Sequence, residues 1–217
     1  MKLPPGFCLR LRLAVILVML GFWTPVHAQI GSGWVQKTYG EILEPETNDV
    51  LFTISPVPGH FFIKQDDFCT YTNSGGVETF NLWNPDSNRI EVRVKNDYTN
   101  GTQQFEGDVL LLPPSDNECV MQIFGSDGNG NATLFMLRGY AANGGSLEHY
   151  GDTVLVTNIY KTWVHVNVIH VNGQYAQAYI NGVLAGQWTR GSNSVASHYF
   201  KYGCYGTLTT SLAGVQW

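Results

Sequence analysis

After residue 28, apolar and polar residues alternate in short runs, and a helical repeat of apolar positions is hard to find. Short β-branched or aromatic runs separated by Gly, Asn, Asp and Pro clusters are typical of strands. The runs fall at 50–54, 60–64, 78–82, 89–94, 102–112, 119–125, 133–140, 146–150, 153–156, 162–171, 174–180, 183–188, 198–206 and 212–217. Many strands without intervening helices predict an all-β fold, a two-sheet jelly-roll β-sandwich.

The clearest part of this pattern is a pair of hairpins near the C-terminus. Asn172-Gly173 and Asn181-Gly182 each separate two short strands. Asn-Gly is the preferred pair for a type I′ turn, in which both central residues need positive φ. We therefore expect a three-stranded meander from 162 to 188.

The first 28 residues have the pattern of a signal peptide. Lys2, Arg10 and Arg12 precede an apolar run at 13–23, which is too short for a membrane span. Small residues then end at Ala28, where we expect cleavage. The mature protein is expected to follow the secretory pathway to the extracellular space, the cell wall or the vacuole, with no membrane association after cleavage.

The mature region, 29–217, shows no linker or break in composition, so we expect a single domain. Asn100 and Asn131 each begin an N-glycosylation tripeptide, consistent with a secreted protein. Cys69, Cys119 and Cys204 allow one disulfide and one free thiol. Their spacing does not match a zinc site, and we expect neither a metal nor a cofactor.

The charge balance excludes some functions. The chain has 12 Lys and Arg against 17 Asp and Glu, and without the signal peptide it has 9 against 17, a net charge of −8. This argues against nucleic acid as a partner, because affinity for phosphate backbones comes mainly from Lys and Arg. A charged fraction of 13% argues against a helical bundle, and 44% hydrophobic residues argue against disorder.

Three of the expected strands place polar groups together on one face. Period-two alternation groups the side chains as follows: Arg89, Glu91 and Arg93; Val120, Gln122 and Phe124; and Tyr199, Lys201, Gly203 and Tyr205. Such a groove suits a ligand with a carboxylate, which Arg can pair and Tyr can contact. The alternative is a solvated face with cross-strand ion pairs, on which Lys201 extends over aromatic surface.

These three segments, in this order, resemble the alginate-lyase jelly-roll superfamily, whose concanavalin A-like unit is the alginate lyase 2 domain. The intervening sequence is similar to the plant citrate-binding-protein branch of that superfamily. The resemblance covers residues 85–217 and rests on 104–107, 119–125, 134–138, 158–160, Trp163 and 166–170.

The resemblance implies a concave face that forms the ligand groove. In active lyases an Arg and the Gln neutralise the uronate carboxylate, while a His and the last Tyr serve as base and acid. Carried over, the catalytic set is Arg93 (or Arg89), Gln122 and Tyr205. Other residues expected to bind the ligand are Arg89, Lys201, Tyr199, Phe124 and Arg138. Phe124 occupies the position of the His.

That substitution favours binding of citrate or a uronic-acid saccharide over catalysis. The alternative is a polysaccharide lyase acting on mannuronate- or glucuronate-type polymers, where one tyrosine, Tyr205, could serve as both base and acid in a syn elimination. Such a lyase would not act on guluronate. A third hypothesis is a lectin for neutral sugars. His149, His165 and His170 are more readily explained as structural or solvated residues.

Two further expectations follow from the groove. If Gln122 and Tyr205 face the ligand, alternation turns Cys119 and Cys204 toward the core, where they would form the disulfide and leave Cys69 free. The groove would also collect four of the nine mature cations, Arg89, Arg93, Arg138 and Lys201. With a net charge of −8, this local positive patch suits a small acid or short oligomer better than a long polyanion.

Overall fold

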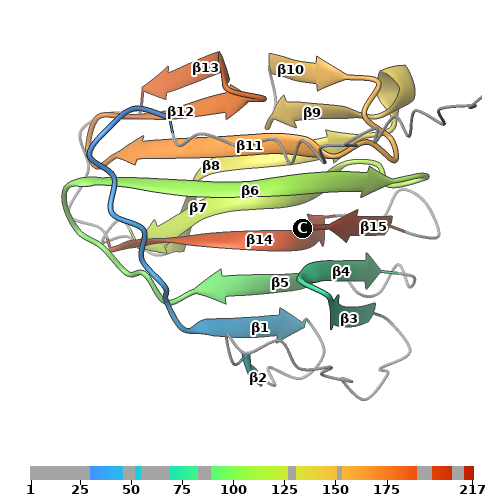
Figure 1. Ribbon diagram of the computed structural model, residues 1–217, viewed down its shortest axis with the longest axis horizontal. Helices are drawn as coiled ribbons and strands as arrows, with labels where there is room; N and C mark the ends of the chain where they lie inside the picture. The colour runs from blue at the N-terminus through green and yellow to red at the C-terminus, as the bar shows by residue number, and fades with distance from the viewer. Residues whose placement is uncertain are drawn as a thin grey trace, which may run out of the picture.

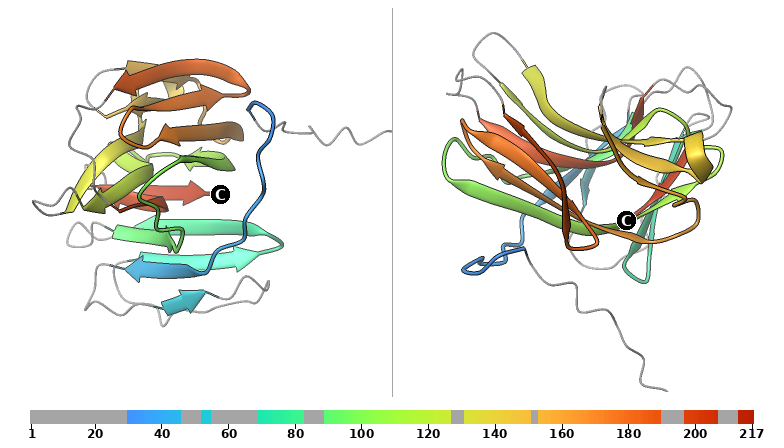
Figure 2. Two further views of the ribbon diagram at one scale, coloured as in Figure 1. Left: turned by 90° about the vertical axis from the view of Figure 1, so that its left-hand side faces the viewer. Right: turned by 90° about the horizontal axis from the view of Figure 1, so that it is seen from above.

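The computed structural model describes residues 30–45, 52–54, 69–82, 89–126, 131–150, 153–189, 197–206 and 213–217. These residues form two curved antiparallel sheets that face each other (Figures 1 and 2). The eight-stranded sheet has the order β10-β9-β8-β7-β14-β5-β1-β2, and the seven-stranded sheet β13-β12-β11-β6-β15-β4-β3. The expected all-β, two-sheet sandwich is confirmed.

The strands have these bounds: β1 Glu41–Pro45, β2 Phe52–Ile54, β3 Cys69–Ser74, β4 Val77–Leu82, β5 Arg89–Val94, β6 Thr102–Leu112, β7 Glu118–Ser126, β8 Asn131–Tyr140, β9 Ser146–His149, β10 Thr153–Thr157, β11 Val164–Val171, β12 Tyr175–Ile180, β13 Val183–Thr189, β14 His198–Gly206 and β15 Ala213–Gln216. The sequence pattern missed β1 and β3. The strand expected at 60–64 lies outside the described residues.

The core lies between the two sheets and consists of the inward side chains of both. Ile90 and Val92 of β5 are fully buried there, as are Phe80 of β4 and Val166 and Val168 of β11. Each of these strands buries one face and exposes polar side chains on the other. The alternation of apolar and polar residues in the sequence therefore identified most of them.

The two Asn-Gly pairs form different turns. Asn181 and Gly182 have φ of 50° and 81°, so both central residues have the positive φ of a type I′ turn. At the first pair, Gly173 has positive φ and Asn172 does not, and Val171 pairs with Tyr175 across a three-residue loop. The β11-β12-β13 meander is confirmed, but the expected type I′ turn is wrong at the first hairpin.

An irregularity in β7 overturns two expectations about which residues share a face. Cys119 pairs with Arg138 and Met121 with Leu137, so Val120 is an extra residue in the strand, as in a β-bulge. Val120 therefore packs into the core beside Met121 instead of sharing the face of Gln122.

The same bulge makes the expected Cys119–Cys204 disulfide wrong. Cys119 lies opposite Tyr205, on the outward face, whereas Cys204 lies opposite the core residue Ile90. Both thiols are free and buried; Cys119 donates to the carbonyl of Met121, and Cys204 to Glu118. Burial raises the pKa of both thiols well above the usual value.

Helical structure is limited in the described residues to one 3-10 turn, Ala142–Gly144, and none of it is long and apolar enough to cross a membrane. Asn100 is exposed before β6, and Asn131 begins β8. Use of either as a glycosylation site stays a prediction, and so does the signal peptide, which lies outside the described residues.

Candidate functional site

The face of the eight-stranded sheet that points away from the other sheet, here called the groove face, carries most of the residues selected from the sequence. The register places Lys201 of β14 between Arg93 of β5 and Gln122 of β7, and Tyr205 between Arg89 and Cys119. Residues directly opposite in an antiparallel pair share a face. The residues of the three motifs are therefore together on one surface, apart from Val120.

The centre of the groove face is organised around Glu91, which is 1% exposed. Gln122 donates from Nε2 to Glu91 Oε1 at 2.6 Å. Arg89 Nε lies 3.2 Å and Lys201 Nζ 3.4 Å from Glu91 Oε2. Burial raises the pKa of Glu91, while Lys201 and Arg89 oppose that shift by favouring the carboxylate.

The resemblance implies that an Arg and Gln122 bind the carboxylate of a ligand. In the structure, Gln122, Arg89 and Lys201 contact the carboxylate of Glu91 instead. Lys201 is 3% exposed and also pairs with Glu44 of β1. The amide oxygen of Gln122, Oε1, accepts a hydrogen bond from Thr133 Oγ1 at 3.2 Å. The polar groups of Gln122 and Lys201 are consequently engaged inside the protein.

Gly203 makes the close packing of this centre possible. It pairs with Glu91 and has φ of 139°, a conformation that other residues rarely adopt. A Cβ at this position would lie 2.5 Å from the carbonyl oxygen of Ile90 and 2.8 Å from Glu91 Cα. The glycine of the third motif is thus required by the backbone of β14 beside β5.

At one end of the groove face, cations lie against aromatic rings. The Arg93 guanidinium carbon lies 4.0 Å from the ring centroid of Tyr199, and Nη2 lies 2.7 Å from Asp97 Oδ1. Lys201 Nζ lies 5.2 Å from the ring centroid of Phe124, and the Phe124 and Tyr199 rings are 5.7 Å apart. Arg93 therefore has both an acidic and an aromatic partner within the protein.

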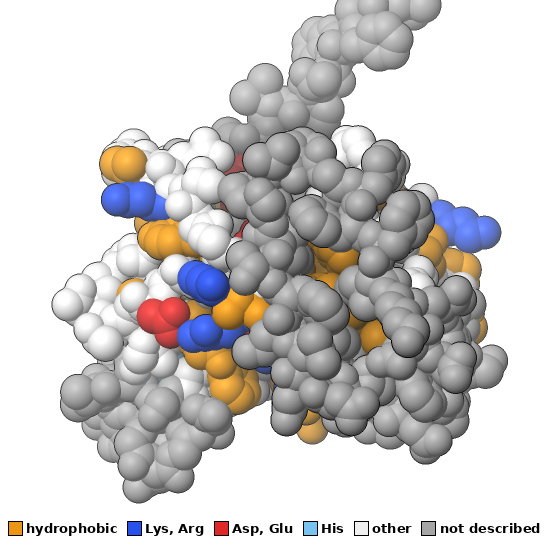
Figure 3. All heavy atoms as spheres, turned by 90° about the horizontal axis from the view of Figure 1, so that it is seen from below, with side chains coloured by type: hydrophobic (Ala, Val, Ile, Leu, Met, Phe, Trp, Pro, Cys, Tyr) orange, Lys and Arg blue, Asp and Glu red, His pale blue; other side chains and the backbone are white. Residues whose placement is uncertain are grey.

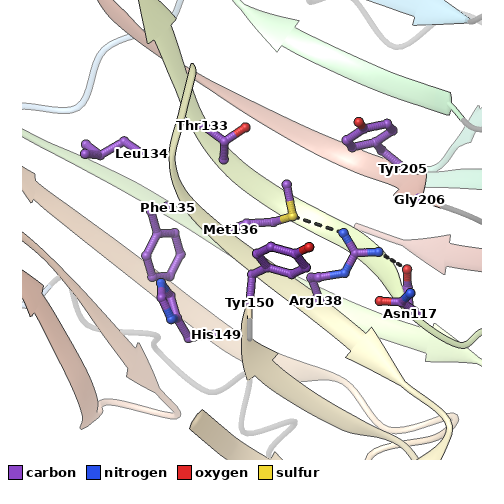
Figure 4. A pocket seen from close by; sticks show the side chains of 10 residues that line it. All are labelled: Asn117, Thr133, Leu134, Phe135, Met136, Arg138, His149, Tyr150, Tyr205 and Gly206. Carbon is purple, nitrogen blue, oxygen red and sulfur yellow. Dashed lines mark hydrogen bonds between the residues drawn. The ribbon is translucent and has the colours of Figure 1, made fainter. Parts of the chain in front are cut away.

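The other end contains a cavity of about 490 Å³ (Figure 4). Its residues come from β8, the position before β7, the ends of β9 and β14, and the turn after β9: Asn117, Thr133, Leu134, Phe135, Met136, Arg138, His149, Tyr150, Tyr205 and Gly206. Figure 4 shows the Arg138 guanidinium between Met136 and Asn117, with Tyr150 beside it and Tyr205 farther away on β14. This volume is within the range of small-molecule sites, about 300–1,000 Å³.

Arg138 differs from the other groove cations in its partners. It is 6% exposed, and it donates to the carbonyl of Asn117 and toward Met136 Sδ, while its guanidinium carbon lies 5.2 Å from the Tyr150 ring. Within the described residues, no carboxylate lies within 4.0 Å of its guanidinium. A buried guanidinium without a carboxylate partner has unused capacity for an anion.

The neighbouring carboxyl is Glu118, which is fully buried. Burial raises its pKa to about 7, although Arg138 lowers it. Gly206 leaves room for both side chains, because a Cβ there would lie 2.8 Å from Arg138 Nη2 and 2.9 Å from Glu118 Oε2. The charge at this end of the groove therefore depends on pH near neutrality.

Figure 3 shows the part of the lower face that the described residues form, where one acidic group lies against basic side chains and other basic side chains stand apart from it. At the centre of the groove face, Arg89 and Lys201 both pair with Glu91. A count of cations therefore overstates the positive charge that this centre offers to a ligand.

None of the three histidines considered from the sequence holds Glu91, and among them His149 alone lines the cavity that contains Arg138. His165 is on the outer face of β11, with Nδ1 3.0 Å from Asp108. His170 is in the core, where its Nδ1 lies 2.7 Å from the hydroxyl of Tyr98, and burial, together with His198, lowers its pKa to about 4. His149 lines the cavity and stacks on Trp188 at 4.2 Å.

Sequence reasoning placed Arg138 and Tyr205 in the groove but missed Asn117 and Tyr150, which complete the cavity. Both follow turns or strand ends, and Asn117 has positive φ of 59°. The available signal for Asn117 was its position directly before β7, the strand that carries Gln122. No group of three or more His, Cys, Asp or Glu in the described part of the chain is arranged to hold a metal ion.

Comparison with known proteins gives one curated relative and many structures of the same fold. No family model matches the chain. It is 37% identical over 128 residues to the citrate-binding protein of Hevea brasiliensis, an alignment covering 58% of this chain and 51% of that protein. The chain thus spans about half the length of the curated relative it matches. This similarity confirms the resemblance to citrate-binding proteins.

Several of the structural neighbours are alginate lyases. AlgAT5 of polysaccharide lyase family 7 superposes with a TM-score of 0.60 at 20% identity, over 82% of this chain and 91% of the lyase. The Pseudomonas aeruginosa lyase PA1167 gives 0.62 at 15% identity, over 82% and 94%. AlyC3 with bound dimannuronate gives 0.60 at 12% identity, over 82% and 86%. At these identities the likeness shows the fold, which is the jelly-roll sandwich expected from the sequence.

Proposed function

We propose that the protein binds a carboxylate-bearing ligand, either a small acid such as citrate or a uronic-acid saccharide, in the cavity at the Tyr205 end of the groove face. The observation that carries the proposal is Arg138. Its guanidinium is buried and lines the cavity, and no described carboxylate lies within 4.0 Å of it, although Glu118 is near enough for Arg138 to lower its pKa. A planar guanidinium can bind a ligand carboxylate with two parallel hydrogen bonds.

The surroundings of Arg138 fit such a ligand. The Tyr205 hydroxyl and the Asn117 side chain offer hydrogen bonds to the hydroxyls of a sugar or a hydroxy acid. Tyr150 is 59% exposed at the rim and can stack on a sugar ring. Met136 and Leu134 supply apolar wall, as most small-ligand sites do.

The comparisons support the same ligand class. The curated relative is named for citrate, and several structural neighbours are named for alginate, one of them with bound dimannuronate. Citrate, alginate and dimannuronate all carry carboxylates. The groups at the centre of the groove face hold Glu91 instead, which supports Arg138 as the residue that binds the ligand carboxylate.

Titration calorimetry of the purified protein tests the proposal. The ligands are citrate, galacturonate, mannuronate oligomers and, as a neutral control, glucose. We expect at least one carboxylate to bind and glucose to bind less tightly. In Arg138→Gln the affinity should fall about 10- to 100-fold, because a charge-assisted hydrogen bond contributes about 1.5–3 kcal/mol.

Arg93→Gln is the matched control, since Arg93 lies on the same face but has Asp97 and Tyr199 as partners. We expect its affinity to stay within about threefold of the original. Equal loss in both variants would contradict the assignment to Arg138, and undiminished binding in Arg138→Gln would end it.

A polyuronate lyase is the second candidate, favoured by the position of Tyr205. Its ring lines the same cavity as Arg138, and the Arg89 guanidinium carbon lies 4.5 Å from the ring centroid. In a syn elimination this phenolate would remove the C5 proton, the C4–O4 bond would break, and the phenol would protonate the departing O4. Ultraviolet absorbance reports the unsaturated product.

Absorbance that rises with polymannuronate or glucuronan, but not with polyguluronate, and that disappears in Tyr205→Phe would establish this lyase. Constant absorbance with each polymer would exclude it. Phe124, beside Tyr199, offers no proton-transfer group of its own, which is why binding is the first proposal.

We further propose that the protein acts after entry into the secretory pathway, in the extracellular space, the cell wall or the vacuole. The motivation is the basic and apolar segment before Ala28. Mass spectrometry of the protein isolated from expressing cells should find Gln29 as the first residue. An intact Met1 in the mature protein would contradict this.

A further inference from the structure

Two of the four methionines, Met121 and Met136, lie in the part of the chain that the structure describes, and their surroundings differ. Met121 of β7 is fully buried in the core between the sheets. Met136 of β8 is half-buried and lines the cavity that contains Arg138. The sulfur of Met136 is therefore accessible to a small molecule that enters this cavity, and the sulfur of Met121 is not.

Met136 lies on the groove face between its centre and its Tyr205 end. It pairs with Gln122 of β7, and Arg138 follows it by two positions on the same face of β8. Arg138 Nη1 donates toward Met136 Sδ at 3.1 Å, the contact drawn in Figure 4. A thioether sulfur is a weak acceptor, so this donor stays available to a stronger acceptor.

Oxidation of the sulfur would replace this weak acceptor by a strong one. A peroxide converts a methionine thioether to a sulfoxide. The sulfur attacks one oxygen of hydrogen peroxide, an S–O bond forms and the O–O bond breaks. The departing hydroxide takes the proton from the new S–OH group and leaves as water. Sulfur thereby loses two electrons, which reduce the peroxide.

The sulfoxide oxygen would form beside the Arg138 guanidinium. Because Sδ lies 3.1 Å from Nη1, an oxygen bonded to that sulfur can reach the guanidinium by rotation about the three flexible bonds of the Met136 side chain. A hydrogen bond from a guanidinium N–H to such an oxygen is charge-assisted, and hence stronger than the bond to the thioether. It would occupy donors that Arg138 otherwise offers to an anion.

The other sulfur atoms of the described residues are protected from a peroxide. Met121 is 0% exposed, and the thiols of Cys69, Cys119 and Cys204 are buried. Burial also raises the pKa of the Cys119 and Cys204 thiols, which leaves little of the reactive thiolate. A peroxide should therefore react first at Met136.

We propose that Met136 is a reversible oxidation site that closes the Arg138 cavity to anions. Hydrogen peroxide, or an organic peroxide small enough to enter the cavity, converts Met136 to the sulfoxide, whose oxygen takes the donors of Arg138. A methionine sulfoxide reductase restores them. The loss of ligand affinity rests on the proposed function, whereas the modification and its contact with Arg138 do not.

Measurements on the ligand-free protein test the site itself. During exposure to millimolar hydrogen peroxide, mass spectrometry should find an added oxygen at Met136 at least about tenfold sooner than at Met121. The nitrogen-15 signal of Arg138 Nε–H should move as the Met136 sulfoxide accumulates, and return after treatment with the reductase. Equal rates at the two methionines, or an Arg138 signal that does not respond, would overturn the proposal.

Calorimetry before and after peroxide tests the effect on ligand binding. Affinity for the best carboxylate should fall about tenfold or more in the original protein and in Met121→Leu, because the ligand must displace a charge-assisted hydrogen bond. In Met136→Leu, peroxide should not change that variant's own affinity, since leucine has no sulfur to oxidise. An equal fall in Met136→Leu would contradict the assignment to Met136.

The two proposals fail in different ways. If no carboxylate binds even before peroxide is added, the proposed function is wrong. The rate of oxidation at Met136 and the response of the Arg138 signal then still decide whether this methionine is an oxidation site that acts on Arg138.

Discussion

The centre of the groove face and its Tyr205 end both contain buried cations, but they differ in what those cations contact. At the centre, Lys201 and Arg89 share the buried carboxylate of Glu91. At the Tyr205 end, Arg138 contacts a backbone carbonyl, a thioether and an aromatic ring. The contacts at the centre are therefore internal to the protein, and the Tyr205 end is where we propose that an anion binds.

The difference shows that position on a functional face does not assign a role. Gln122 and Lys201 match family motifs, yet their polar groups are occupied by Glu91, Glu44 and Thr133. Arg138, outside the three motifs, is the buried groove cation for which the described residues provide no carboxylate partner within 4.0 Å. The two regions both contain cations, so the number of charges does not distinguish them. The partners of those cations within the protein do.

The largest expected effect is on stability at the centre. Glu91→Gln leaves Arg89 and the 3%-exposed Lys201 without a shared buried anion, so urea unfolding should show a loss of about 3 kcal/mol. That value is at the low end for a broken buried pair because Glu44 still contacts Lys201. Arg138→Gln, the matched change at the other end, should alter stability by about 1 kcal/mol or less. Equal losses would remove the distinction between the regions.

The next effect concerns the shape of the cation at the Tyr205 end. Arg138→Lys keeps the charge but loses the planar pair of donors, so calorimetry should show affinity for the best carboxylate reduced about 5- to 20-fold. Arg93→Lys, at a paired position, should change it by less than about twofold. An Arg138→Lys variant that binds as well as the original would mean that charge alone is recognised.

A smaller effect is expected from pH. Glu118, with a pKa of about 7 raised by burial, is neutral in mild acid, so its contribution to stability is present below pH 4.5 and lost as pH rises through 7. Its negative charge opposes an anion beside Arg138. Affinity for galacturonate should therefore rise about three- to tenfold from pH 8 to pH 6.

In Glu118→Gln that pH dependence of affinity should disappear. The control is Glu44→Gln, at the Lys201 side of the groove, which should leave the dependence intact. A slope that survives in Glu118→Gln would show that another group near Arg138 titrates in this range.

The smallest effect is expected at the Tyr205 hydroxyl. Tyr205→Phe removes one hydrogen-bonding group from the cavity while the ring, stacked with Arg89, remains. Calorimetry should show affinity reduced by about three- to tenfold at most. A complete loss of binding would mean that the ligand is held by Tyr205 more than by Arg138.

Alternation along the chain predicted most strands because one face of each is buried, as in β5, where Ile90 and Val92 are inside and Arg89 and Arg93 outside. It missed β1, which has few apolar residues and ends in Pro45, and β3, which is rich in Thr and Ser. Their strand character comes from pairing with β5 and β4.

The bulge at Val120 and the Asn172 turn were beyond the pattern, because local sequence does not specify an extra residue in a ladder. The same limit applied to the site. The sequence pattern placed Arg89, Gln122 and Lys201 on one face. It did not show that Glu91 would contact all three, because those contacts depend on the register of β5 with β14. The bulge at Val120 explains why the disulfide expectation failed, because it turns Cys119 to the outward face.

The most direct test of the account observes the arginines themselves while a carboxylate binds. Nitrogen-15 NMR of the guanidinium Nε–H groups, assigned by Arg→Lys variants, would be recorded as citrate or galacturonate is added. We predict that the Arg138 signal moves with the binding isotherm while those of Arg89 and Arg93 stay in place. Movement of the Arg89 or Arg93 signal with Arg138 unchanged would contradict the assignment of the ligand to the Tyr205 end.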